Sequence, residues 1–328
     1  MIVDVHLHTG TVGEQIAPAM FKHLRTVFRV RAYKPAELEA DVDAPQREQG
    51  SLIALMDTNG VDLGCVMAGD WRRAYGCYRD PESGDPMDYY VSNDYVAALV
   101  RRYPGRLVGT MNVDPLRDPA AACREMVRCV EELGMKGMKL YPTYQHFDPS
   151  DERVFPVYKQ AIELDLPVQF HMGWTPVPNA PMRYQRPELL DDVGHRFPEL
   201  KVVICHMAYP WYETANVLIS KYRNFYGELS GWGLFYPEKL LRLLHDYGSL
   251  CPFEKLLYGS ENPLMASSLA MFRELDAAAD RSGLPRIDPA AVRLILGENA
   301  LRLYQIDAAA MARAAGAGQP VSAPAVER

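Results

Sequence analysis

Four histidines and one glutamate stand at the ends of apolar runs in this sequence. His6 and His8 lie two residues apart in one run, His171 and His206 each end another, and Glu261 follows the run LLYGS. Because successive side chains of a strand alternate between its faces, His6 and His8 are expected to point to the same side. A single histidine at a strand end is more often only hydrogen-bonded. Together, however, imidazole and carboxylate groups form a ligand set that zinc, manganese or iron accepts, so the five residues predict a divalent metal site.

The elements that must position these residues alternate in a regular way. Apolar, β-rich runs are separated by amphipathic segments such as 120–133, 154–164, 187–197 and 237–247, with apolar residues three and four apart. The eight runs are IVDVHLH, VDLGCVMAG, RLVGTMNV, GMKGMKLYP, PVQFHMGW, KVVICHM, FYGELSG and KLLYGSENP.

Continuous apolar strands separated by helices indicate an α/β fold with a parallel sheet covered on its outer face. Eight such units predict a closed (β/α)8 TIM barrel, whose active sites lie at the carboxyl ends of the strands. A doubly wound open sheet is the competing fold, but no G-x-G-x-x-G or Walker loop follows the first run. Residues 1–306 are expected to form one barrel domain, and 307–328 a mobile tail of small residues.

Two excursions interrupt the alternation, at residues 10–50 after the first strand and at 76–90 after the second. Both can cover a pocket. The first contains a basic stretch, MFKHLRTVFRVRAY, that is expected to be helical.

The composition indicates which kinds of ligand and which cellular compartment to expect. The 328 residues carry a formal net charge of -7, spread along the chain rather than in blocks, which disfavours nucleic acid and membrane surfaces and favours a small-molecule substrate. No apolar run approaches a membrane span, and the N-terminus lacks the features of a signal peptide, so a cytoplasmic protein is expected. The six cysteines lack metal-binding spacing and are interpreted as reduced thiols.

Several further side chains are candidates for the site. Lys139 ends the fourth run and is either an exposed charge at the start of a loop or a carboxylated lysine that bridges two metal ions. Aromatic residues near strand ends either line a pocket or pack helices against the barrel, and arginines past strands two and five either bind an acidic substrate or are surface residues. The aromatic candidates are Tyr144, Trp174, Tyr209, Trp211 and Trp232; the arginines are Arg72, Arg73 and Arg183; Asp70 and Asn112 are weaker polar candidates.

The ordered set of motifs resembles the amidohydrolase superfamily, and within it the amidohydrolase-related branch that includes aminocarboxymuconate semialdehyde decarboxylase. The phrases GMKGMKLYPTYQHFDPSD, LKVVICHM and GENALRLY carry the likeness, together with the strand around His171. The resemblance implies that His6, His8 and His171 bind metal and that His206 binds a second ion or polarises substrate. It also implies one or two divalent ions and a homo-oligomer. Glu261 stands where the family normally has an aspartate.

Four functions follow as hypotheses. The leading one is hydrolysis by metal-activated water, with zinc as the first choice of metal and manganese or iron as alternatives, Glu261 as the proton carrier and His206 as the group that steadies the oxyanion. The second is non-oxidative decarboxylation of an aromatic or unsaturated acid. The third is oxygen chemistry at a dinuclear iron or manganese centre that includes Lys139. The fourth is a structural subunit without catalytic activity.

Overall fold

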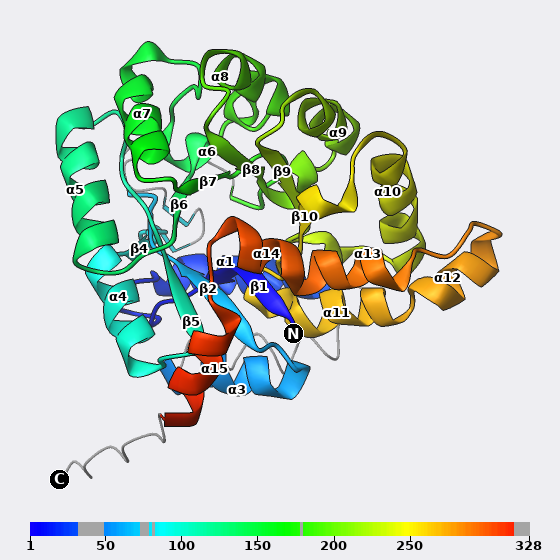
Figure 1. The fold of residues 1–328 in the computed structure, drawn as a ribbon. Coiled ribbons are helices and arrows are strands. Elements are labelled where there is room, and N and C mark those ends of the chain that lie inside the picture. The colour runs from blue at the N-terminus through cyan, green and yellow to red at the C-terminus, as the bar shows by residue number, and fades with distance from the viewer. Residues whose placement is uncertain (32–48, 73–78, 81–82, 178–179, 318–328) are drawn as a thin grey trace, which may run out of the picture.

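Eight parallel strands form a nearly closed barrel surrounded by helices, as Figure 1 shows, which confirms the predicted fold. The computed structural model describes residues 1–31, 49–72, 79–80, 83–177 and 180–317. The strands, in the order in which they pair, are β1 (Val3–His8), β2 (Leu63–Met67), β5 (Leu107–Met111), β6 (Gly137–Leu140), β7 (Pro167–Phe170), β8 (Lys201–Ile204), β9 (Phe225–Glu228) and β10 (Leu256–Leu257). The Val5 amide donates to the Tyr258 carbonyl oxygen at 3.1 Å and thereby joins the last strand region to the first.

Helices follow the strands, and most of them cover the outside of the barrel. They are α1 (Pro18–Arg31), α3 (Gln49–Asn59), α4 (Asn93–Arg102), α5 (Pro119–Glu131), α6 (Pro142–Gln145), α7 (Phe155–Glu163), α8 (Asp191–Arg196), α9 (Tyr212–Lys221), α10 (Pro237–Leu250), α11 (Met265–Arg273), α12 (Leu275–Ser282), α13 (Pro289–Arg293) and α14 (Asn299–Leu303). Helix α5 illustrates the local rules: Asp118 caps it by accepting from the Ala121 amide, and Ala122, Met126 and Cys129 form its buried stripe.

The excursions add elements at the carboxyl end of the barrel. The basic stretch after β1 forms α1, as predicted, while residues 32–48 lie outside the described residues. In the second excursion, β3 (Gly69–Asp70) pairs antiparallel with β4 (Tyr90–Val91). Residues 73–78 and 81–82, which include Arg73 and Cys77, also lie outside the described residues.

A polar contact inside the barrel fixes the closing segment GENALRLY. The side-chain amide of Gln169 donates to the Tyr304 hydroxyl at 2.7 Å and to the Val5 carbonyl oxygen at 2.8 Å. Tyr304 packs in an apolar cluster with Val5 and Val203. The last helices are therefore held to the strands that carry the site.

The first part of the predicted tail is helical, and the mobility of the tail stays a prediction. Residues Ala308–Ala317 form helix α15, and Met311 packs against the cluster around Tyr304. Alanine has the highest helix propensity of all residues, and α15 lies so close to Gly105 that a side chain there would come within 2.3 Å of the Met311 carbonyl oxygen. Residues 318–328 lie outside the described residues.

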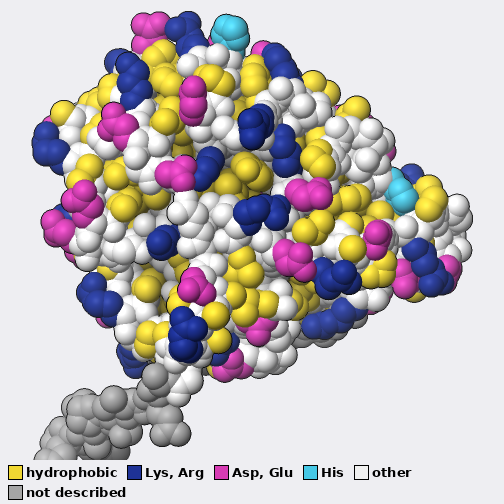
Figure 2. Space-filling view, in the orientation of Figure 1, with side chains coloured by type: hydrophobic (Ala, Val, Ile, Leu, Met, Phe, Trp, Pro, Cys, Tyr) yellow, Lys and Arg dark blue, Asp and Glu magenta, His cyan; other side chains and the backbone are white. Residues whose placement is uncertain are grey.

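The surface in Figure 2 carries positive and negative side chains interspersed over the visible face. This distribution fits the spread of charge along the sequence. In the described part of the chain, no helix combines the length and apolar character needed to cross a membrane.

Candidate metal centre and active site

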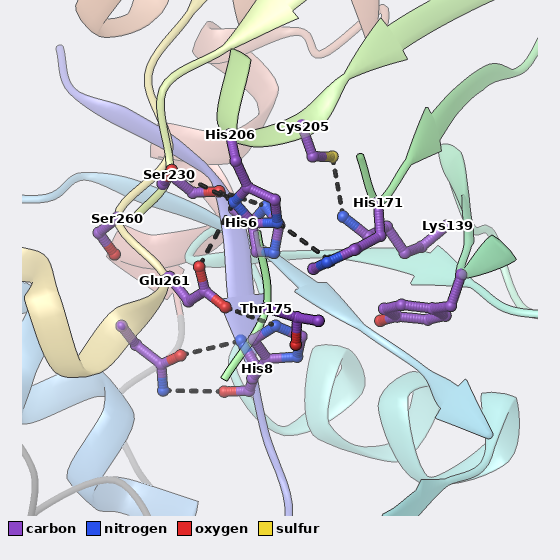
Figure 3. Close-up of polar contacts among 12 residues, drawn as sticks. His6, His8, Lys139, His171, Thr175, Cys205, His206, Ser230, Ser260 and Glu261 are labelled. Atoms are coloured by element: carbon purple, nitrogen blue, oxygen red, sulfur yellow. Dashed lines mark hydrogen bonds and ion pairs between the residues drawn. The ribbon is translucent and has the colours of Figure 1, made fainter. Parts of the chain in front are cut away.

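The structure brings together the five residues predicted as ligands. His6, His8, His171, His206 and Glu261, here called the histidine cluster, meet where β1, β7, β8 and β10 end (Figure 3). The ring centroids of His6 lie 5.1 Å from those of both His8 and His206, and the His171 and His206 centroids lie 4.6 Å apart. The pairing of His6 and His8 on one face follows from the period of two in β1.

Backbone contacts between β1 and the segment after β10 place Glu261. The Glu261 amide donates to the His6 carbonyl oxygen at 3.1 Å. The side-chain amide of Asn262 accepts from the His8 amide and donates to the His8 carbonyl oxygen, both at 3.0 Å. These contacts bring the carboxyl group of Glu261, at the end of its apolar run, next to the two histidines of β1.

Left-handed backbone conformations turn two of these side chains into the site. Glu261 has φ 61°, and His206, Met207 and Ala208 have φ 59°, 46° and 49°. Such angles are unfavourable for residues with a β-carbon, by about 1–3 kcal/mol each, and persist where the surroundings enforce them. They occur here at two residues of the histidine cluster, which is where a functional constraint would maintain them.

A buried carboxylate behind the histidines was not predicted. Glu228 ends β9 and is fully buried, and its Oε2 lies 3.1 Å from His6 Nδ1 and accepts from the Ser230 hydroxyl at 2.8 Å. The Ser230 Oγ also lies 2.9 Å from His6 Nδ1 and 2.8 Å from His206 Nδ1. The signal was present in the seventh run, FYGELSG, where an acid and a serine two residues apart stand at a strand end, as His6 and His8 do.

Lys139 is fully buried, so its interpretation as an exposed charge is wrong. Its ammonium group donates to Cys205 Sγ at 2.8 Å, as Figure 3 shows. Burial raises the pKa of the Cys205 thiol to about 12, although Lys139 opposes the shift. Cys205 is a free cysteine, as predicted, but it lies beside the site. A carboxylated Lys139 stays a prediction.

Burial controls the protonation of the histidine cluster. It lowers the pKa of His6, His171 and His206 well below the ordinary value, and the pKa of His8 to about 3. These imidazoles are thus neutral near pH 7, the form that binds metal. Burial raises the pKa of Glu261 to about 7; Lys139 opposes that shift and Glu228 adds to it.

The residues fit a divalent ion. The Nε2 atoms of His6 and His171 are buried and have no hydrogen-bond partner among the described residues, which is unusual for polar atoms away from water. His6, His8 and Glu261 offer ligand atoms within 4.8 Å of one another. His6 and His8, with His171 beside them, would hold the ion, and the Glu261 carboxyl group would lie next to it.

A second group of three residues, His6, Cys205 and Glu228, also has its ligand atoms within 4.8 Å of one another. Its two additional members already have partners, since Cys205 accepts from Lys139, and Glu228 contacts His6 and Ser230. The first group, with its unpartnered nitrogen atoms, is therefore the better metal site.

Two cavities open onto Glu261. The larger, of about 700 Å³, is lined by His8, Thr9, Ile16, Phe21, Leu24, Arg25, Trp71, Tyr89, Tyr144, Pro176, Val177, Glu261, Asn262 and Pro263. The smaller, of about 400 Å³, is lined by His171, Trp174, Pro176, His206, Tyr209, Ser230, Gly231, Trp232, Leu234, Phe235 and Glu261. Both excursions contribute to the larger cavity, through α1 and through Tyr89 next to β4, as expected of segments that cover a pocket.

An aromatic stack forms one wall of the larger cavity. Trp71 stacks on Tyr89 and on Tyr144, with ring centroids 4.2 and 4.4 Å apart. The Tyr144 and Thr175 hydroxyls are hydrogen-bonded to each other. The Tyr89 hydroxyl donates to the Thr9 carbonyl oxygen at 3.1 Å and lies 3.4 Å from His8 Nδ1. The wall thus joins an apolar surface to the histidine cluster.

Most of the aromatic residues that were predicted to contact substrate line one of the two cavities. Tyr144 lines the larger cavity, and Trp174, Tyr209 and Trp232 line the smaller, whereas Trp211 lines neither.

The predicted arginines lie elsewhere. Arg72 is 43% exposed and forms a two-bond ion pair with Asp70, and Arg183 is exposed in a short helical turn. Neither lines a cavity that contains Glu261. Arg25 of α1 lines the larger cavity instead. It was missed because its place over the barrel mouth depends on how the first excursion folds back. Asn112, the other weak candidate, has a structural role, since its side chain donates to the Lys139 carbonyl oxygen at 2.8 Å.

Curated proteins with similar sequences carry decarboxylase and hydratase names. Decarboxylase orsB of Emericella nidulans is 26% identical over 240 residues, 57% of this chain and 69% of that protein. The 2-amino-3-carboxymuconate-6-semialdehyde decarboxylase of Dictyostelium discoideum is 25% identical over 170 residues, 47% of this chain and 46% of that protein. The 2-keto-4-carboxy-3-hexenedioate hydratase of a Sphingobium strain is 30% identical over 88 residues, 25% of this chain and 26% of that protein. The chain thus spans less than half of the last two.

Solved structures with the same fold cover almost the whole chain. An uncharacterised TIM-barrel protein of Bordetella bronchiseptica matches with a TM-score of 0.68 and 21% identity, over 95% of this chain and 99% of that chain. A 5-carboxyvanillate decarboxylase of Novosphingobium aromaticivorans, in complex with manganese and 4-hydroxy-3-methoxy-5-nitrobenzoic acid, matches with a TM-score of 0.61 and 16% identity, over 93% and 96% of the two chains.

The resemblance found in the sequence is confirmed by a match along nearly the whole barrel. The amidohydrolase family profile covers residues 3–306, from the first residue of β1 to the end of the segment that holds the barrel closed. This chain belongs to the amidohydrolase family and is an enzyme of that superfamily.

Proposed function

We propose that this enzyme is a metal-dependent, non-oxidative decarboxylase of an aromatic or unsaturated carboxylic acid. The observation that carries the proposal is the position of Glu261. Its carboxyl group, with a pKa raised to about 7, lies where two largely apolar cavities meet the histidine cluster. In the metal-free protein this group exchanges a proton near neutral pH, and we assign to it the transfer of a proton to carbon.

The larger cavity suits a planar acid. Its aromatic stack offers an apolar face to a ring, and Arg25 offers a cation to a carboxylate. Two of the three curated relatives described above are named decarboxylases, and the manganese-bound structure with the same fold is a decarboxylase in complex with a substituted benzoic acid.

The ion and the side chains would have different roles in the reaction. When bound, a divalent ion supplies positive charge that holds substrate oxygen atoms and draws electrons away from the bond that breaks. Glu261 provides the proton: the bond between the carboxylate carbon and its neighbour breaks, carbon dioxide leaves, and the electron pair left on the neighbour takes the Glu261 proton. The overall change is R–COO⁻ + H⁺ → R–H + CO₂. The neutral imidazole of His206, with Nδ1 3.5 Å from Glu261 Oε2, orients the carboxyl group.

Hydrolysis, the leading hypothesis from the sequence, is the second candidate. A carboxyl group with a pKa near 7 can also take a proton from water, so the acid alone does not separate the two reactions. The names of the relatives favour decarboxylation, and so does the apolar character of the larger cavity.

The deciding experiment uses enzyme that has been stripped with chelator and reconstituted with Mn²⁺ or Zn²⁺. It is incubated in D₂O with two panels, one of hydroxybenzoates and unsaturated dicarboxylic acids, the other of esters, lactones and amides. We expect carbon dioxide release from the first panel and one deuterium at the carbon that lost it. Hydrolysis of the second panel without carbon dioxide release from the first would refute the proposal. Equal rates with and without oxygen would count against the dinuclear oxygenase hypothesis.

A further inference from the structure

The hydrogen-bond donors around Glu228 show which form of His6 the protein maintains. Glu228 Oε1 accepts from the Ser230 amide at 2.5 Å, and Oε2 accepts from the Ser230 hydroxyl at 2.8 Å and from the His206 amide at 3.3 Å. Three donors directed at two oxygen atoms fit an ionised carboxylate, which can only accept hydrogen bonds. The His6 Nδ1 atom, 3.1 Å from Oε2, therefore carries a proton, and its buried Nε2, which has no hydrogen-bond partner among the described residues, carries a lone pair.

The same reasoning applies to His206 and extends to His171. His206 Nδ1 lies 3.2 Å from the Ser230 carbonyl oxygen, an acceptor, so the proton of this neutral ring is on Nδ1. His206 Nε2 then has a lone pair, and His171 Nδ1, 3.1 Å away, must donate to it. The remaining nitrogen of His171, its Nε2, is left with a lone pair.

These assignments account for the two buried nitrogen atoms that lack partners in the described part of the chain, Nε2 of His6 and Nε2 of His171. Both have a lone pair available for an ion. We propose that the Glu228 carboxylate and the backbone carbonyl of Ser230 fix the tautomers of three histidines, His6 and His206 directly and His171 through His206, so that the ligand nitrogens are ready before metal binds. The proposal rests on the metal site of the proposed function, not on the identity of the reaction.

His8 is held separately and serves as an internal reference. Its Nδ1 lies 3.4 Å from the Tyr89 hydroxyl, which donates to the Thr9 carbonyl oxygen. The hydrogen bonds of Glu228 and Ser230 go to His6 and His206 instead, so changes at β9 should leave the His8 tautomer as it is.

The first test is nitrogen NMR of the metal-free enzyme with ¹⁵N-labelled histidine, with each ring assigned by substitution. In the wild type, His6, His171 and His206 should carry their proton on Nδ1. A proton on Nε2 of His6 or of His171 would overturn the proposal without any variant.

The second test compares Glu228→Gln with Ser230→Ala. The side-chain amide introduced by Glu228→Gln can donate to His6 Nδ1, so this variant should convert a substantial fraction of His6 to the Nε2-protonated form while His171 keeps its tautomer. Zn²⁺ affinity, measured by chelator competition, should fall about 10- to 100-fold, the usual effect of losing a partner behind a metal ligand. Ser230→Ala retains the carboxylate and the carbonyl oxygen, so it should keep all three tautomers and lower affinity less.

A matched control is Glu188→Gln, which removes one negative charge from an exposed ion pair with Arg186 and should leave affinity unchanged. An unchanged His6 tautomer and unchanged Zn²⁺ affinity in Glu228→Gln would refute the proposal. Two zinc ions per wild-type chain and one in Glu228→Gln would also refute it, because Glu228 would then be a ligand of a second ion with Cys205. Neither result depends on whether the enzyme decarboxylates, so failure here is distinguishable from failure of the proposed function.

Discussion

The histidine cluster and the larger cavity meet at Glu261 but are built differently. The cluster consists of residues at the ends of barrel strands, and the rings of His6, His171 and His206 are hydrogen-bonded to Glu228, to Ser230 or to one another. The larger cavity is lined mainly by segments between strands, among them α1 and the residues around β4. Residues on a rigid scaffold can hold an ion to a fraction of an ångström, whereas connecting segments can change without disturbing it.

This contrast assigns the two regions different tasks. We propose that the cluster supplies the chemistry and that the cavity selects the substrate. Substitutions in the cluster should therefore reduce turnover or metal content, and substitutions in the cavity should change apparent affinity for substrate.

The strongest disruption is loss of the ion from the cluster. We expect the double variant His6→Ala/His8→Ala to retain no stoichiometric metal by elemental analysis. Turnover should fall by about 10³-fold or more, because the ion contributes several kcal/mol to catalysis. His195→Ala, on the exposed face of α8, is the control and should keep its metal. A double variant that retains one ion per chain would show that the ion is bound elsewhere.

Glu261→Gln tests the acid at the boundary between the two regions. With metal in excess, turnover should fall by about 10²- to 10⁴-fold, the usual range for loss of a positioned acid or base. The Michaelis constant should change much less, because the amide fills the same space. Steady-state kinetics and metal content measured on one preparation separate loss of the proton donor from loss of the ion. Turnover within a factor of two of wild type would remove Glu261 from the mechanism.

Arg25→Ala should act on the cavity alone. If Arg25 pairs with a substrate carboxylate, the Michaelis constant should rise about 10- to 100-fold, from the loss of a charge-assisted hydrogen bond of about 1.5–3 kcal/mol. Turnover at saturation should change little, and Arg25→Lys should recover part of the loss. Arg72→Ala, outside both cavities, is the matched control. Equal effects of Arg25→Ala and Arg72→Ala would show that Arg25 does not contact substrate.

The pH dependence of stability is the smallest expected effect and reports on the cluster without metal. Its four histidines have lowered pKa values, so unfolding takes up protons below the ordinary value of about 6.5, and stability falls as the pH falls. Glu261 and the buried Asp4 oppose this trend, because their pKa values are raised to about 7 and the folded state binds protons that the unfolded chain has released.

Since four groups outweigh two, the metal-free protein should lose about 1.5–2 kcal/mol between pH 6.5 and 5.5. Glu261→Gln removes one opposing group and should steepen the loss by about 1 kcal/mol. Urea denaturation at several pH values measures both quantities. Stability that rises towards pH 5.5 would mean that the histidines are protonated in the folded protein.

The same contrast explains what the sequence could and could not predict. The ends of parallel strands converge at one face of a barrel, so the positions of His6, His171 and Glu261 followed from the pattern of strands. The interpretation of Lys139 as an exposed charge was wrong, although a charged residue at a strand end is usually exposed, because Lys139 is buried against Cys205.

The cavity was less predictable because loops do not follow a period. Arg72 and Arg183 were candidates only through their closeness to strand ends along the chain, but sequence proximity does not determine where a loop directs a long side chain. Arg25, which does line the larger cavity, comes from a helix within an excursion.

Gly259 lies in a place behind the histidine cluster where there is no room for a side chain. At Gly259, two residues before Glu261, a β-carbon would lie 2.0 Å from Glu228 Oε1 and 2.8 Å from the β-carbon of His6. A smaller residue at 228 would relieve the first contact but not the second, because the β-carbon of His6 is fixed to β1. Glycine should therefore be the residue recovered at 259 in a saturation library, whichever residue stands at 228. Selection for a new activity in this scaffold would have to leave position 259 alone.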